Sequence, residues 1–413
     1  MRPSEPTRRP EPAQQSIRVL FADDSAVTRL IITDALKDES GLELIGCAED
    51  GNECVAMFRS LRPDVVLLDV DMPNQNGIET LRKIRSSDPH VPVIMFSTLT
   101  VRGGDATLDA LSAGATDYVA KPSGVGTLDR ALEFLRAEVI PKLRQWGKRS
   151  QQLREKASGG NRSDNSFVER KSEKPALRGC TTFRVQSDEA SSLKPSNESE
   201  NTSIRLFRPS SRVTRPKPIQ LIAIGSSTGG PTALAELICA LPGDLSVPVV
   251  IAQHMPPIFT GQLAERLDRE SPLTVREGID GAVLRPGEVW VAPGDFHMTV
   301  SREGVETVLR LNQNPPENSC RPAVDVLFRS AATVFGGSTL AVVLTGMGRD
   351  GTLGCQALKV LGANILVQDE ASSVVWGMPR SVIEAGLADA VLPLKDIAAE
   401  IRMRVRSTMA AAT

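Results

Sequence analysis

Short apolar runs alternate with amphipathic stretches along the N-terminal part of the chain. The runs IRVLFA, LELIGC, DVVLLDV, VPVIMFS and TDYVAK have the length and apolar content of buried strands. Between them, stretches such as SAVTRLIITDALKDE and GIETLRKIRSS repeat apolar residues at helical spacing. Five β–α repeats of this size predict a doubly wound α/β domain around a parallel sheet, which we place at residues 16–143.

This pattern is lost in residues 144–217. Segments such as KRSQQLREKASGGNRSDNSFVERKSEK and SSLKPSNESENTS are polar, charged and rich in serine, with few apolar residues that could build a core. We therefore expect a disordered linker of roughly 70 residues between two folded domains.

The alternation returns in residues 218–406. The runs IQLIAI, VPVVIAQ, EVWVAP, TLAVVLTG, ANILVQ and ADAVLPL predict strands, whereas ELICAL, LAERLDRE, AVDVLFRSAATVF and GTLGCQALKVL predict helices. HMTVSREG and VETVLRLN read as the two arms of a hairpin. The prediction is a second doubly wound α/β domain, mostly parallel with antiparallel additions.

Composition narrows the class of protein. The 413 residues are 41% hydrophobic and 24% charged with a net charge of −2, which gives no reason to expect nucleic acid or a membrane as partner. The N-terminus has no apolar signal segment, and no run approaches the roughly 18 apolar residues that cross a bilayer. We expect a cytoplasmic protein without membrane insertion. The six cysteines show no CxxC spacing, which argues against structural zinc and favours reduced, buried thiols.

Acidic residues follow the predicted strands of the first domain. The first strand ends in Asp23 and Asp24, the third ends in Asp69, and Lys121 follows the fifth. Because these strand ends share one edge of a parallel sheet, three carboxylates and one ammonium group should converge, a set that suits Mg²⁺. A carboxylate in such a pocket can attack a phosphoryl donor and become an acyl phosphate. The simpler alternative is that acidic residues favour loops, with Asp24 capping the helix that starts at Ser25.

Residues 17–122 resemble the receiver domain of two-component response regulators in the segments VLFADDSAVTR, DVVLLDVDMPNQNGIETL, MFSTLT and GATDYVAKP. The resemblance implies a histidine kinase as phosphodonor and gives a role to each matching position: Asp69 as phosphoacceptor, Asp23, Asp24, Asp69 and the Asp71 backbone carbonyl as Mg²⁺ ligands, Ser97 and Tyr118 as switch residues, and Lys121 as phosphate partner. The sequence departs from the family at Gln75 and Asn76, a change expected to affect loop packing.

A glycine-rich loop, AIGSSTGGPTAL at residues 223–234, separates the first strand and helix of the second domain. It could cradle a phosphate or present a reactive serine. A dinucleotide fingerprint needs G-x-G-x-x-G, but Ser227 stands where the second glycine belongs, and the loop has no P-loop lysine. His254 ends the next strand and Asp350 lies in TGMGRDG, so nucleophile, base and orienting acid are all available. Individually, these three residues could equally be a structural serine, a core histidine and a turn aspartate.

Residues 219–400 resemble the catalytic domain of the chemotaxis protein-glutamate methylesterases, the CheB family, in AIGSSTGGP, QHMPPIFT, APGDFHM, RPAVDVLF, TGMGRDG and EASSVVWGMPR. The resemblance implies a hydrolase-type α/β domain with Ser227 as nucleophile, His254 as base and Asp350 as orienting acid. It places Thr228, Gly229 and Met347 around the oxyanion. Ser226 stands where relatives often have alanine, so the choice between the two serines needs a test, and His297 lies in a family motif without being the base.

The implied reaction is hydrolysis of glutamate γ-methyl esters on chemoreceptors with release of methanol, together with deamidation of receptor glutamines, and the esterase step needs no cofactor. The resemblance also implies that the unphosphorylated receiver hinders the esterase. Two rival classes remain at this point. One is a non-enzymatic regulator that binds a partner when Asp69 is phosphorylated, and the other is a nucleotide-dependent oxidoreductase that uses the glycine-rich loop.

Overall fold

The computed structural model describes residues 16–98, 100–121, 128–159 and 217–410. None of the helices in these ranges has the length and apolar character required to cross a membrane.

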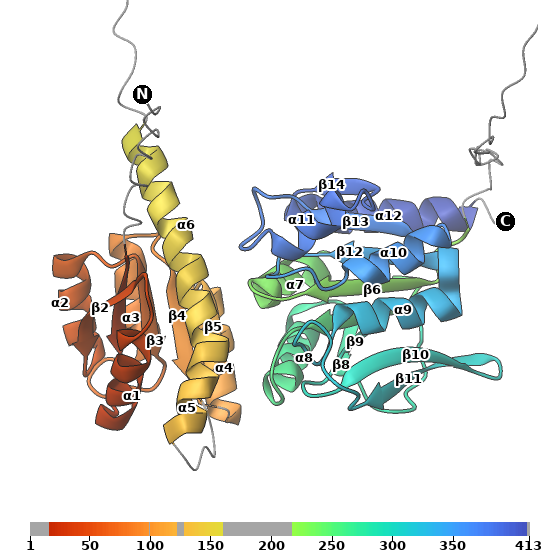
Figure 1. The fold of residues 1–413 in the computed structure, drawn as a ribbon. Helices are drawn as coiled ribbons and strands as arrows, with labels where there is room; N and C mark the ends of the chain where they lie inside the picture. Colours follow the sequence, from red (N-terminus) through yellow and green to blue (C-terminus); the bar gives the residue numbers. More distant parts are fainter. Residues whose placement is uncertain (1–15, 99, 122–127, 160–216, 411–413) are drawn as a thin grey trace, which may run out of the picture. The chain divides into compact units, whose positions relative to one another are not determined.

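The N-terminal domain contains the five expected strands in one parallel sheet, ordered β2-β1-β3-β4-β5 (Figure 1). The strands are β1 (Ile17–Ala22), β2 (Leu42–Ala48), β3 (Val65–Asp69), β4 (Val93–Ser97) and β5 (Asp117–Ala120). The connecting helices are α1 (Ala26–Lys37), α2 (Gly51–Leu61), α3 (Gly77–Ser87) and α4 (Val101–Ser112). In this strand order the carboxyl ends of β1 and β3 are neighbours, which brings the predicted acidic residues together.

The start of α1 rules out the simpler alternative for Asp24, that it caps this helix. Ser25 is the N-cap, and its Oγ accepts a hydrogen bond from the Thr28 backbone N–H at 3.3 Å. Asp23 Oδ1 accepts the Ser25 N–H at 2.9 Å. The capping position is therefore occupied by a hydroxyl, as helix N-termini prefer, and the exposed Asp24 carboxylate is not the cap.

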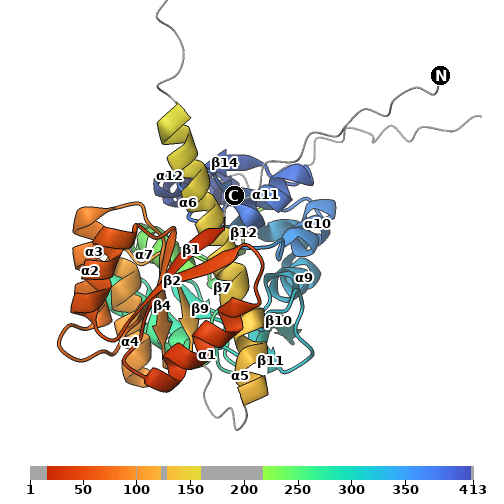
Figure 2. The same cartoon turned by 60° about the vertical axis from the view of Figure 1, so that its left-hand side comes forward.

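The expected linker begins later than residue 144. A continuous helical segment runs through α5 (Leu128–Phe134), a π-helical turn (Leu135–Val139) and α6 (Ile140–Gly159), visible as the long yellow helix in Figures 1 and 2. Leu143 and Trp146 are buried on one face of α6, and Arg154 pairs with Asp64 at 2.8 Å. Polar residues surround these few apolar positions, so the sequence pattern predicted a linker here and not a packed helix. Residues 160–216 of the expected linker lie outside the described ranges.

The C-terminal domain has a seven-stranded parallel sheet, ordered β14-β13-β12-β6-β7-β9-β8, and a separate two-stranded antiparallel hairpin. The strands are β6 (Leu221–Ser226), β7 (Val249–Gln253), β8 (Thr274–Glu277), β9 (Glu288–Val291), β10 (His297–Glu303), β11 (Glu306–Asn312), β12 (Thr339–Val343), β13 (Asn364–Gln368) and β14 (Ala390–Leu392). The expected strands and hairpin are present. The edge strand β8 was not predicted, because its four residues, TVRE, bury only Val275 completely.

Helices cover both faces of this sheet. The residues of α7 (Gly230–Cys239), α8 (Phe259–Glu270) and α12 (Leu394–Ala410) belong to one hydrophobic cluster, and those of α9 (Val324–Phe335), α10 (Thr352–Val360) and α11 (Gly377–Glu384) belong to another. This arrangement confirms a doubly wound fold.

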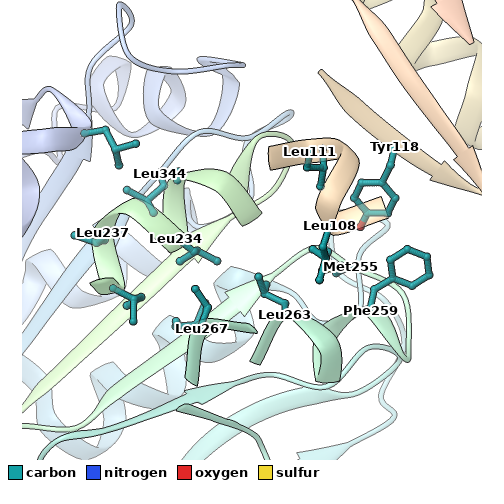
Figure 3. Packing of buried hydrophobic residues seen from close by; sticks show 14 of the residues in the cluster. Leu108, Leu111, Tyr118, Leu234, Leu237, Met255, Phe259, Leu263, Leu267 and Leu344 are labelled. Carbon is teal, nitrogen blue, oxygen red and sulfur yellow. The ribbon is translucent and has the colours of Figure 1, made fainter. Parts of the chain in front are cut away.

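The packing of α7 and α8 positions the two loops in which they begin. Leu234 and Leu237 of α7, together with Leu263 and Leu267 of α8, are buried in the cluster drawn in Figure 3. Full burial of each leucine side chain contributes about 2 kcal/mol. The loop before α7 carries Ser227 and the loop before α8 carries His254, so this core holds both loops in place.

The packing of α6 generates a stability prediction. Trp146→Ala should lower the free energy of unfolding of the N-terminal domain by about 3–5 kcal/mol, because the indole is 2% exposed and leaves a cavity. Lys148→Ala, two residues along on the exposed face, should change it by no more than about 0.5 kcal/mol. Urea unfolding of the full-length protein, followed by far-UV circular dichroism, measures both. Equal effects of the two substitutions would mean that α6 does not pack as described.

Candidate active site and phosphorylation site

The acidic pocket of the N-terminal domain forms where β1, β3 and β5 end. Lys121 Nζ lies 2.9 Å from Asp23 Oδ2 and 2.8 Å from Asp69 Oδ2. Asp23, Asp24 and Asp69 each offer a carboxylate oxygen within 4.8 Å of the others. Asp23 and Asp69 are buried, whereas Asp24 is exposed at the mouth. The structure therefore brings together the carboxylates and the ammonium group that the sequence predicted.

Burial dominates the electrostatics of this pocket. It raises the pKa of Asp69 to about 6 even though the Lys121 ammonium opposes the shift. The pKa of Asp23 is raised for the same reason. Burial alone would lower the pKa of Lys121, but the two carboxylates reverse that direction and raise it. One ammonium group cannot neutralise three clustered carboxylates, so the oxygen-rich pocket fits a hard divalent cation such as Mg²⁺.

The remaining predicted residues of this domain lie on β4, on β5 and in the loop after β3. Ser97 ends β4, and its buried Oγ donates to the Gly103 carbonyl at 3.0 Å. Tyr118 lies on β5. The Asp71 backbone N–H approaches Asp69 Oδ1 at 3.4 Å, which places the exposed Asp71 beside the phosphoacceptor candidate.

The departure at Gln75 has a structural consequence. The side chain is 3% exposed, donates to Thr80 Oγ1 at 2.9 Å and accepts a hydrogen bond from Lys83 Nζ. Asn76 caps α3 through the Glu79 N–H at 2.9 Å. The loop after Asp69 is thus tied to α3 by side-chain amides.

In the C-terminal domain, the loop between β6 and α7 distinguishes its two serines. Ser226 is 0% exposed, and its Oγ donates to Gln253 Oε1 at 2.7 Å. Ser227 is half-buried and lies beyond the end of the strand. Ser226 therefore serves the packing of the strand end, and Ser227 is the serine accessible to a substrate.

Two glycines allow the backbone to fold tightly around Ser227. Gly229 has φ +77°, and a Cβ there would lie 2.5 Å from Val374. A Cβ on Gly346, in the loop after β12, would lie 2.9 Å from Ser227 Cβ. Gly229 and Gly346 thus let neighbouring segments of the domain pack closely around Ser227. This role differs from binding the phosphates of a nucleotide.

Backbone donors are available beside the serine. Within the described ranges, the N–H groups of Thr228 and Gly229 have no hydrogen-bond acceptor, whereas the Gly230 N–H donates to the Ser227 carbonyl at 2.8 Å. Free N–H groups at the start of a helix favour developing negative charge. Met347 is exposed in the loop that contains Gly346.

His254 and Asp350 form a close pair at the same end of the sheet. Their Nε2 and Oδ2 atoms are 2.7 Å apart. The carboxylate also accepts backbone N–H groups from Val324 at 2.6 Å, Asp325 at 3.0 Å and Gly351 at 2.9 Å, and the Asn318 amide at 2.9 Å. Burial would raise the pKa of Asp350, but the imidazole and the N–H donors at the start of α9 outweigh it and hold the pKa at about 2. Asp350 is therefore ionised.

The ionised carboxylate decides which imidazole nitrogen acts as base. A carboxylate can only accept, so when the imidazole is neutral Nε2 carries its one proton and Nδ1 presents the lone pair. Burial would lower the pKa of His254, but Asp350 and Cys320 raise it to about 10. Among the described residues, Nδ1 contacts Cys320 Sγ at 3.4 Å and makes no hydrogen bond to Ser227 Oγ. The described structure therefore joins His254 to Asp350 by a hydrogen bond but does not join it to Ser227.

Sequence reasoning gave no role to several residues around this pair. Asn318 bridges Asp350 and Asp325, with amide distances of 2.9 and 3.1 Å. Asp325 is 1% exposed, and burial raises its pKa. The Gln253 amide joins the serine and histidine loops. Asp325 and Cys320 stand in or beside RPAVDVLF, but nothing in their spacing shows that the loop folds back onto His254.

His297 has a structural position. It is 1% exposed, its Nε2 lies 3.1 Å from the Pro315 carbonyl, and its Nδ1 accepts the Ala323 N–H at 3.2 Å. Both ring nitrogens are occupied by backbone groups, so His297 anchors the segment that leads into α9 and has no free nitrogen for catalysis.

Comparisons with known proteins follow this division of the chain. The CheB methylesterase family matches residues 222–401, and the response regulator receiver domain family matches residues 19–133. The crystal structure of the Thermotoga maritima CheB methylesterase catalytic domain is 45% identical, with a TM-score of 0.44, and the match covers 44% of this chain and 97% of that one. The response regulator domain of Thermotoga maritima CheB is 39% identical, with a TM-score of 0.30, over 32% and 98% of the two chains.

The chain is thus a response regulator that joins a receiver domain to a methylesterase domain. A protein-glutamate methylesterase/protein-glutamine glutaminase of Trichodesmium erythraeum is 42% identical over 94% of this chain and 99% of its own length. One of the same name from a Nocardioides species is 44% identical over 94% and 95%. The chain belongs to the protein-glutamate methylesterase/protein-glutamine glutaminase family.

The His254–Asp350 pair generates a pH prediction. The imidazole must be neutral to accept a proton, so kcat/KM for ester hydrolysis should rise with pH, with a midpoint above the 6.5 of an ordinary histidine. Asp350→Asn removes the charge that raises the pKa of His254, so the midpoint should move to lower pH while the maximal rate falls. Asp244 is exposed, and Asp244→Asn, the control, should leave the midpoint and the maximal rate unchanged. The measurement is a pH–rate profile corrected for uncatalysed hydrolysis. An unchanged midpoint in Asp350→Asn would contradict the assignment.

Proposed function

We propose that this chain hydrolyses glutamate γ-methyl esters on chemoreceptors, releasing methanol, and deamidates specific receptor glutamines. The observation that best supports this proposal is the different environment of each polar residue at one edge of the sheet. Ser227 is accessible while Ser226 is sequestered, and His254 is oriented by an ionised Asp350. The family relationship gives the substrate class. Two rival classes were a regulator without an active site and a dinucleotide-dependent enzyme. Neither explains this arrangement of serine, histidine and aspartate as well.

The reaction follows the ordinary course of serine-dependent acyl transfer. His254 Nδ1 takes the proton of Ser227 Oγ as the oxygen attacks the ester carbonyl. The N–H groups of Thr228 and Gly229 stabilise the resulting oxyanion, a contribution of about 3 kcal/mol for each well-placed donor. The imidazolium returns its proton to the departing methoxide, and methanol leaves. Water, deprotonated by His254, then hydrolyses the acyl-enzyme to glutamate. With a glutamine substrate the first leaving group is ammonia.

Asp350 acts through His254 in this scheme. Its carboxylate accepts the Nε2–H, fixes the tautomer and stabilises the imidazolium that forms during proton transfer. The backbone N–H groups of Val324 and Asp325 at the start of α9 keep that carboxylate ionised and in place. Met347, exposed beside the serine loop, borders the space that the substrate carbonyl would occupy.

The receiver is proposed to control this reaction through phosphorylation of Asp69 by a histidine kinase. Asp23, Asp24, Asp69 and the Asp71 backbone carbonyl would hold Mg²⁺. When bound, the ion would screen the charge of the phosphoryl oxygens. Lys121 would pair with the phosphoryl group, and Ser97 and Tyr118 would report its presence. In the unphosphorylated state the receiver would hinder access to Ser227, and phosphorylation would relieve this.

A comparison of two neighbouring serines tests the nucleophile. Ser227→Ala should reduce methanol release from methylated receptors by at least about a thousandfold, because it deletes the attacking oxygen. Ser226→Ala is the matched control: it removes one buried hydrogen bond and should cost about 1 kcal/mol of stability with most activity retained. Circular dichroism of both variants checks folding. If Ser226→Ala is the inactive variant, the register of the loop is wrong.

Phosphorylation is tested on the full-length chain. Acetyl phosphate with Mg²⁺ should introduce a hydroxylamine-sensitive phosphate and raise the rate of methanol release. Asp69→Asn should abolish both effects, because it removes the acceptor carboxylate. Asp71→Asn is the control: its backbone carbonyl is unchanged, so labelling should persist. Labelling that persists in Asp69→Asn would point to another acceptor. A rise in methanol release without labelling would show that phosphorylation of the receiver does not control the esterase.

A further inference from the structure

The base of the proposed reaction has a second neighbour, the thiol of Cys320. Its Sγ lies 3.4 Å from His254 Nδ1, the nitrogen that Asp350 leaves free. The loop that carries it is fixed, because the Cys320 N–H donates to the Glu317 carbonyl at 2.9 Å and the Glu317 N–H donates back at 3.1 Å. The residue is partly exposed, and Asn318 and Ser319 before it are exposed. A rigid loop therefore presents a reachable sulfur to the catalytic imidazole.

The tautomer of His254 gives this contact a direction. Nε2–H points to the Asp350 carboxylate, so Nδ1 of the neutral imidazole accepts from the Cys320 S–H, and after proton transfer the Nδ1–H faces the thiolate. A thiol that donates to a base can transfer its proton, and the thiolate is the nucleophilic form of cysteine. The same nitrogen must receive the proton of Ser227 during ester hydrolysis. Any group added to the Cys320 sulfur would occupy the space next to Nδ1.

We propose that Cys320 is a reactive thiol whose covalent modification by small electrophiles, peroxide included, switches off the esterase by blocking His254 Nδ1. The reactive thiol rests on the Cys320–His254 geometry alone, whereas the loss of activity rests also on the proposed function.

Two reactions express this inference. With iodoacetamide, the sulfur attacks the methylene carbon, the C–S bond forms, the C–I bond breaks with release of iodide, and the thiol proton passes to His254 and then to solvent. With hydrogen peroxide, the sulfur attacks one oxygen, the S–O bond forms and the O–O bond breaks. The products are a sulfenic acid and water: sulfur is oxidised by two electrons and peroxide is reduced. A dithiol reduces the sulfenic acid back to the thiol.

The other described cysteines lack this combination. Cys54 and Cys355 are 0% exposed, and burial raises the pKa of Cys54 to about 12 and that of Cys355 still further from its usual range. Cys47 and Cys239 are partly exposed, but burial raises the pKa of each thiol. Cys180 lies outside the described ranges, so the experiment controls for it directly.

The test uses the full-length protein with Cys180→Ser as the common background. Iodoacetamide at neutral pH should label the Cys320 peptide first and reduce methanol release about a hundredfold, in step with labelling, because the base is blocked. Cys320→Ser and Cys320→Ala, each compared with its own untreated rate, should be insensitive to the reagent. Cys239→Ser is the matched control and should be inactivated like the background protein. Peroxide should inactivate the same set of variants, and dithiothreitol should restore activity.

A second readout tests the role of His254 without any activity measurement. In His254→Ala, alkylation of Cys320, followed by mass spectrometry, should be at least about tenfold slower, because the thiol loses its proton acceptor. An unchanged labelling rate would overturn activation by the base. Full activity with Cys320 labelled, or inactivation that persists in Cys320→Ser, would overturn the shut-off. If untreated Cys320→Ser and Cys320→Ala are as inactive as Ser227→Ala, the sulfur would be a nucleophile rather than a regulatory site.

If the untreated background protein releases no methanol, the proposed function is wrong, and so is the claim that modification of Cys320 switches off the esterase. The labelling rates of the background protein and His254→Ala still decide whether the thiol and the imidazole act together. The two failures are therefore distinguishable in one set of samples.

Discussion

The catalytic half of the molecule depends on a single buried carboxylate. Asp350 is 2% exposed, yet it remains charged because the first N–H groups of α9, the Asn318 amide and the His254 imidazole all donate to it. A buried charge without such partners would cost several kcal/mol. The carboxylate therefore does two things at once: it anchors the start of α9 and fixes which nitrogen of His254 is basic. In the proposed reaction Ser227 would transfer its proton to that nitrogen, and Cys320 Sγ lies beside it.

The two domains use buried carboxylates in opposite ways. Around Asp350 the protein supplies enough donors to hold the pKa at about 2. Around Asp69 it supplies one ammonium group for a cluster of carboxylates, and burial raises the pKa to about 6. The first site is complete as it stands and can orient a base without assistance. The second is short of positive charge, which is the condition under which a pocket gains most from binding a cation together with a phosphoryl group.

Sequence reasoning reached both folds because strand and helix periodicity is a local property. It found the Asp23–Asp69–Lys121 pocket and placed Ser227, His254 and Asp350 at the ends of strands, since parallel strands bring such ends to one edge. It missed the helix beyond residue 143, where a few apolar positions are diluted by polar neighbours. It also missed Asn318 and Cys320, which reach the site from a loop. No period or motif describes where a loop folds, so only the folded structure places Asn318 and Cys320 near His254.

The amide of Gln253 has a consequence for how this active site can change over time. It accepts a hydrogen bond from Ser226 at 2.7 Å and donates to the carbonyls of Ser227 and His254 at 2.9 and 3.0 Å. One side chain thus links the backbone of the proposed nucleophile to the backbone of the proposed base. A substitution at position 226 alters the hydrogen bonding of an amide that positions both, so the free energies of changes at 226 and 253 should not add. The effect of a substitution at one of these positions therefore depends on the residue present at the other, which constrains the order in which a lineage can acquire substitutions at both.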